Sequence, residues 1–128
     1  MRFGLMGFRL LLCVGWVVLF VISVRAIRQM GAGAAGTIFI GDFAYPWRAQ
    51  FNTDFTIHLL LAASWMVYRT KSLAIGLICA FLAINLGAVF TLAYLLIVSI
   101  RAKGDFAKVL LGDRYPADSP LVYQSGGL

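Results

Sequence analysis

Three long apolar runs separated by short polar segments dominate the hydropathy pattern of this chain. The first, LLLCVGWVVLFVISV at residues 10–24, lies between Arg9 and Arg25. A helix of that length extends about 22 Å, short of a hydrocarbon core of about 30 Å, so residues 3–8 have to contribute. The pattern predicts a transmembrane helix over residues 3–25. A cleaved signal peptide is the competing interpretation, and we expect the segment to be retained.

The second run covers residues 53–69 and the third covers residues 73–100. As one continuous helix the third would reach about 42 Å, so it would have to tilt or emerge from the bilayer. The few residues between these runs predict a tight antiparallel hairpin. We therefore expect an all-α fold, an integral membrane three-helix bundle that forms a single membrane domain over residues 1–128.

The polar segments complete this picture. Residues 29–52 begin with a Gly/Ala-rich stretch and continue with TIFIGDFAYPW, a pattern that favours an aromatic loop lying in the membrane interface between the first two helices. The final segment, 113–128, has two prolines and predicts an extended C-terminal tail. The residues expected at the membrane interface are Tyr45, Trp47, Arg48, Tyr68 and Arg69.

Composition supports the membrane class, because 62% of the 128 residues are apolar and 12% are charged. The net charge of +6 comes from scattered basic residues, which indicates anchoring at lipid headgroups and argues against nucleic-acid binding. With three spans, the loop and tail on one side carry more Lys and Arg than the other side. The positive-inside rule then favours an N-terminus outside and a C-terminus in the cytoplasm.

Small residues recur in the third run at spacings of 4, 3, 4 and 4: Gly76, Ala80, Ala83, Gly87 and Thr91. This spacing places them on one helical face, where they predict close helix–helix packing. Asn85 lies near the middle of the same run, and we expect it to form an interhelical hydrogen bond.

A polar stripe follows the second run, where Asp54, His58 and Trp65 share one helical face. In the structural interpretation, Asn52 or Thr53 caps the start of the helix, and Asp54, in the first turn, pairs with Arg48 or His58. An ionisable residue in a span usually faces the bundle interior or water.

Two functional interpretations compete with the structural one. His58, with Trp65 seven residues on, could be the axial ligand of a haem or a chlorophyll-type pigment. Alternatively, Asp54 and His58 could be a catalytic acid–base pair or proton relay acting on a lipid-soluble substrate. No metal cluster is indicated, and Cys13 and Cys79 are expected to be buried free thiols. A bound lipid, a pigment and haem all stay open as the cofactor.

A further pattern runs through residues 45–102: Pro46, Trp47, Asp54, Phe55, Trp65, Tyr68 and Arg69. In these residues the chain resembles a family of small multi-span membrane proteins grouped as domains of unknown function. The resemblance implies a multi-span fold and no particular activity, and His58 lies outside it. A fainter similarity is to helix pairs of integral-membrane terpene cyclases, which have more spans and acidic residues that this chain lacks.

Taken together, these features predict a non-catalytic accessory or assembly subunit. We expect it to dock on a larger integral membrane complex through the small-residue face of the third helix and the aromatic loop.

Overall fold

The computed structural model describes residues 2–116, which are helical throughout apart from short turns and contain no strand. The elements are α1 (Arg2–Met30), α2 (Ala34–Gly41), η1 (Asp42–Ala44), α3 (Pro46–Arg69), α4 (Leu73–Leu86), α5 (Ala88–Arg101), α6 (Phe106–Leu111) and η2 (Gly112–Arg114). The all-α prediction is therefore confirmed for this part of the chain. The expected tail over 113–128 is different at its start, because 112–114 form a 3₁₀ turn, and residues 117–128 lie outside the described part.

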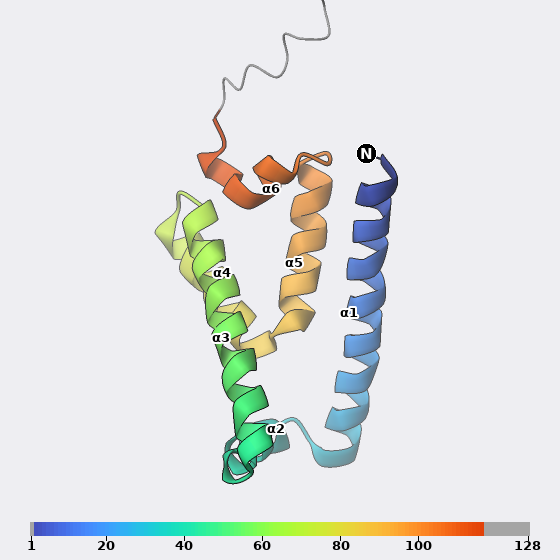
Figure 1. The fold of residues 1–128 in the computed structure, drawn as a ribbon, viewed down its shortest axis with the longest axis vertical. Helices are drawn as coiled ribbons and strands as arrows, with labels where there is room; N and C mark the ends of the chain where they lie inside the picture. Colours follow the sequence, from blue (N-terminus) through green and yellow to red (C-terminus); the bar gives the residue numbers. More distant parts are fainter. Residues whose placement is uncertain (1, 117–128) are drawn as a thin grey trace, which may run out of the picture.

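Helix α1 runs the full height of the molecule (Figure 1). Within residues 2–116, its segment Gly4–Met30 alone is both long and apolar enough to cross a membrane, by length and composition. Leu12 is buried, whereas most of the helix is exposed, so α1 is not the central helix of a water-soluble core.

The connection between α1 and α3 is mostly helical, where a loop over residues 29–52 was predicted. Gly31, at φ 81°, ends α1, and α2 with η1 then leads to Tyr45. Tyr45 is extended, as expected before proline, and Pro46 begins α3 at its first position. Residues 34–41 are helical although glycine costs about 1 kcal/mol relative to alanine in a helix. Because Pro46 begins α3, this helix starts seven residues earlier than predicted.

Helices α3 and α4 form the expected antiparallel hairpin around a turn at residues 70–72. The Ser72 hydroxyl accepts a hydrogen bond from the Ile75 N–H (3.4 Å) and caps α4. Close contact depends on Gly76, because a Cβ there would lie 3.0 Å from the Cα of Val67. The small residues of α4 thus let the two backbones approach each other.

The prediction of one continuous helix over residues 73–100 is wrong. Gly87 separates α4 from α5 with φ 57° and ψ −139°, a conformation open essentially only to glycine. The chain reverses there at about half the height of the molecule, and α5 returns toward the end where α4 began (Figure 1). The expected three-helix bundle is thus replaced by two long helices, α1 and α3, with a shorter α4–α5 hairpin between them.

Helix α5 packs antiparallel against the first half of α1. The Arg9 guanidinium donates to the Ser99 hydroxyl (3.1 Å) and to the Ser99 carbonyl (2.8 Å). One level lower, the Trp16 indole N–H donates to the Val89 carbonyl (2.9 Å). These bonds fix the register of α5 on α1.

A short cap, made of α6 and η2, closes the end of the molecule where α5 finishes. The Asp105 carboxylate caps α6 by accepting from the Lys108 N–H (3.2 Å). The cap, the start of α1 and the α3–α4 turn all lie at this end, which we call the cap end (Figure 1). The three-span prediction had placed the N-terminus and the C-terminal segment at opposite ends, and the reversal at Gly87 is the reason for the difference.

Candidate functional site

Asp54 and His58 lie together on α3, as their spacing predicts, but they face outward. Their side chains are 61% and 69% exposed. The His58 Nδ1 lies 2.8 Å from the Asp54 backbone carbonyl and 3.7 Å from the Asp54 carboxylate. A carbonyl can only accept, so Nδ1 carries a proton, and in the neutral ring Nε2 then offers a lone pair. With a neutral ring, the pair therefore presents two acceptors: a carboxylate and an imidazole nitrogen.

The prediction that Asn52 or Thr53 is the N-cap residue of α3 is wrong, because the helix begins at Pro46. Asp54 therefore lies beyond the first turn of the helix. Asn52 instead donates from its side chain to the Phe39 carbonyl (3.1 Å), which ties α3 to α2. Arg48 pairs with Asp42 at 2.9 Å and not with Asp54. This leaves Asp54 without an arginine or lysine within 4.0 Å among the described residues.

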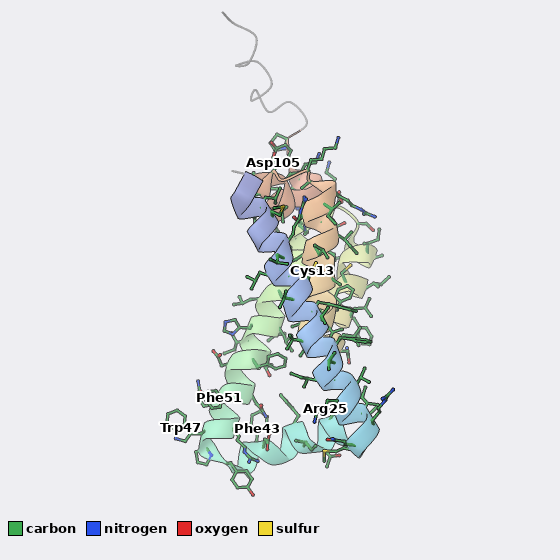
Figure 2. All side chains as sticks on the ribbon, turned by 90° about the vertical axis from the view of Figure 1, so that its right-hand side faces the viewer. Cys13, Arg25, Phe43, Trp47, Phe51 and Asp105 are labelled. Atoms are coloured by element: carbon green, nitrogen blue, oxygen red, sulfur yellow. The ribbon has the colours of Figure 1, made fainter. Side chains whose placement is uncertain are left out.

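Asp54 and His58 belong to a regular pattern on one face of α3. Six residues on this face are spaced alternately by 4 and 3, the pattern of a helix–helix packing seam: Trp47, Phe51, Asp54, His58, Leu61 and Trp65. We call the first five the α3 seam. Trp47, Phe51 and Leu61 are 76%, 63% and 63% exposed, and Figure 2 shows Trp47 and Phe51 on the outer side of the lower part of α3.

Trp65, by contrast, contacts the cap. Its indole N–H donates to the Leu110 carbonyl (3.1 Å), and its ring meets that of Tyr94 edge-on at 5.9 Å. Arg69 lies over both rings, 5.4 Å from each centroid. The structure thus places Trp65 in contact with α5 and α6, while the His58 side chain stays exposed.

The small-residue face of α4 is used within the chain. Gly76, Ala80, Ala83 and Gly87 are buried, whereas Thr91 lies beyond the reversal on α5 and is half-buried. Asn85 is exposed and donates to the Phe81 carbonyl of its own helix (2.8 Å), not to another helix. The predicted helix–helix contact of this face is thus made with α3 of the same chain, and docking of a partner on it stays untested.

The residues predicted at the membrane interface fall at the two ends of α3. Arg48 lies 4.8 Å from the Tyr45 ring centroid at the lower end, close to Trp47. At the cap end, the Arg114 guanidinium lies 5.0 Å over the Tyr68 ring and donates to the Tyr68 carbonyl. Arg69 is one residue further along the chain. Aromatic and basic side chains thus gather at both ends of the helix.

A cavity of about 200 Å³ in the cap end is the main feature that the sequence did not reveal. Its charged lining consists of Arg69, Arg101, Lys108 and Asp113. Hydrogen bonds from the Lys71 backbone N–H and the Thr70 hydroxyl hold the pKa of Asp113 below its usual value. Arg69, Thr70 and Lys71 are far in the sequence from Arg101, Lys108 and Asp113, and no local motif connects the two segments.

The described residues contain no group of three or more His, Cys, Asp or Glu side chains close enough to hold a metal ion. Cys13 is exposed and Cys79 is half-buried, so the expectation of two buried thiols is wrong. Figure 2 labels Cys13 on α1.

No family model matches the chain, and no match was found among curated proteins or solved structures. The resemblance seen in residues 45–102 therefore stays a prediction.

Proposed function

We propose that the protein is a multi-pass integral membrane protein in which α1 and α3 cross the bilayer and the α4–α5 hairpin enters it from the cap end. The length and apolar character of α1 support this. Arg48 and Arg69 bracket α3 at a separation of about 32 Å, close to the thickness of a hydrocarbon core. The outward residues of all the long helices are largely apolar, as lipid contact requires.

The charge distribution supports an orientation with the cap end in the cytoplasm. Eight of the eleven basic residues belong to that end: Arg2, Arg9, Arg69, Lys71, Arg101, Lys103, Lys108 and Arg114. The other end has Arg25, Arg28 and Arg48. Under the positive-inside rule, both ends of the described chain would face the cytoplasm. This replaces the orientation predicted for three spans, in which the N-terminus was outside.

Within this arrangement, we infer that the protein is a non-catalytic accessory or assembly subunit that docks on a larger membrane complex through the α3 seam. The outward position of Asp54 and His58 carries the inference. Measured along α3 from Arg48, Asp54 lies about 9 Å and His58 about 15 Å into the membrane. An ionisable side chain at such depth is costly against lipid and normally meets a partner.

The chemistry of the seam defines the partner. Asp54 and the His58 Nε2 both accept hydrogen bonds, so the partner helix has to present a donor at the same depth, such as an arginine, a lysine or an amide. Trp47, Phe51 and Leu61 would pack around that contact, and their 4–3 spacing suits a helix crossing at about 20°. The 4–3 spacing of the seam, the exposure of its side chains and its acceptors without a donor thus all support contact with a transmembrane helix of another protein.

Site-specific photocrosslinking in native membranes tests this proposal. A benzophenone amino acid at Leu61 is expected to give one discrete heavier adduct, and Asp54→Leu in the same chain is expected to reduce it strongly. Ile78, equally exposed but on α4, is the matched control position and should give no such adduct.

Two results would contradict the proposal. One is an adduct of twice the chain's mass, because the seam would then join two copies of this protein. The other is equal labelling from Leu61 and Ile78 that does not respond to Asp54→Leu, which would indicate that lipid covers both faces.

A further inference from the structure

The cap cavity lies where the ends of α3 and α5 meet α6 and η2. Arg69 comes from α3, Arg101 from α5, Lys108 from α6 and Asp113 from η2, while Val98 and Ala102 add apolar surface. Four elements therefore bring three cations and one carboxylate to one cavity of about 200 Å³.

Arg69 is held in place before any ligand arrives. Its Nε donates to the Val109 carbonyl (3.1 Å) and its NH1 donates to the Tyr94 hydroxyl (2.8 Å). Gly112 allows this position, because a Cβ there would lie 2.5 Å from the Arg69 carbonyl oxygen. Two of the five guanidinium N–H donors are used, so the remainder can reach a ligand without loss of side-chain freedom.

The charges of the cavity are not balanced within the described residues. Asp113 already accepts hydrogen bonds from the Thr70 hydroxyl (3.1 Å) and the Lys71 N–H (3.2 Å). In that part of the chain, Arg69, Arg101 and Lys108 have no carboxylate within 4.0 Å. The lining thus carries an excess of two positive charges beside a single carboxylate that is tied to the α3–α4 turn.

We propose that this cavity binds a phosphate group, either the headgroup of an anionic phospholipid or a free phosphate ester. A tetrahedral anion can accept from three separate cations at once, and arginine suits phosphate through paired N–H donors. The cavity lies beyond Trp65 and Tyr68 on α3, at the level where headgroups would lie in the proposed membrane arrangement. The proposal itself stands on the cavity and its charges, independently of the α3 seam.

The test is a binding titration on the purified full chain in neutral detergent. The probes are dihexanoyl phosphatidic acid, inorganic phosphate and, as the zwitterionic control, dihexanoyl phosphatidylcholine. Arg101→Gln and Lys108→Gln should each raise the Kd for the phosphate probe about tenfold, since each removes one charge-assisted hydrogen bond. Neither side chain is held in a hydrogen bond within the described residues, and circular dichroism checks that both variants fold.

Lys103→Gln is the matched control, because it removes a cation from the same end but outside the cavity lining. Tighter binding of phosphatidic acid than of inorganic phosphate would identify a lipid headgroup, and equal binding would identify a free phosphate. Both results support the phosphate site if the cavity variants weaken binding and the control does not. Absence of binding, or equal loss in Lys103→Gln, would overturn it.

Discussion

Replacement of Gly87 by alanine tests the reversal between α4 and α5. At φ 57° and ψ −139° a residue with a Cβ is strained by about 1–3 kcal/mol. The side chain itself would fit, because the Cβ would lie 3.5 Å from the Phe55 ring and 4.0 Å from Leu59. The cost is therefore confined to the backbone. In a continuous helix, alanine would in addition gain about 1 kcal/mol over glycine.

Together these effects favour a straight helix over residues 73–100 by about 2–4 kcal/mol relative to the wild-type chain. The bonds of Arg9 to Ser99 and of Trp16 to Val89 oppose this change, since they hold α5 against α1. We expect the hairpin to persist in Gly87→Ala, with a free energy of unfolding lowered by about 1–3 kcal/mol.

The assay is reversible unfolding in mixed detergent micelles, followed by circular dichroism, with a C-terminal topology reporter in cells. Gly36→Ala is the control, because Gly36 lies within α2 and nothing lies within 4 Å of its added Cβ. Equal stability of the Gly87 and Gly36 variants, with reporters unchanged, would refute the assignment of the reversal to this glycine.

Three other predictions follow from separate contacts. Asp113, whose pKa is held low mainly by the Lys71 N–H, should stabilise the folded cap above about pH 4 and lose this contribution as the pH falls through its lowered pKa. Unfolding measured as a function of pH should show the loss of stability, and Asp113→Asn should abolish this pH dependence. Gly76→Leu should cost at least about 1–3 kcal/mol of unfolding free energy by overpacking the α3–α4 contact, whereas Gly7→Leu should change little. The purified protein should show no visible absorption band; a Soret band lost in His58→Ala would instead make His58 a haem ligand.

The long helices could be predicted because apolar length and periodicity decide them locally. The run after Arg9 forms α1, and the spacing from Gly76 to Gly87 places small residues in the contact with α3. The reversal could not be predicted, because a single glycine in an apolar run is also compatible with a continuous membrane helix. The bonds that hold the returning α5, such as Trp16 to Val89, join residues far apart in the sequence.

The candidate site could likewise be predicted only where the positions depend on local spacing. The i, i+4 spacing predicts that Asp54 and His58 are neighbours, whereas their exposure depends on which face of α3 the small residues of α4 cover. The cap cavity depends on α6, whose six residues show no pattern that would dock them on α3. Asp113 and Lys108 therefore gain their position from tertiary contacts and not from any motif.

The short reach of the α4–α5 hairpin also affects how the chain would be inserted during synthesis. Each of its helices has 14 residues and extends about 21 Å, too little to cross a bilayer alone. With the cap end in the cytoplasm, the polypeptide carried to the far side would be residues 25–48, where Asp42 offsets the charge of Arg48. The α4–α5 hairpin and the cap would not be carried across, so within residues 2–116 only the paired insertion of α1 and α3 would translocate polypeptide.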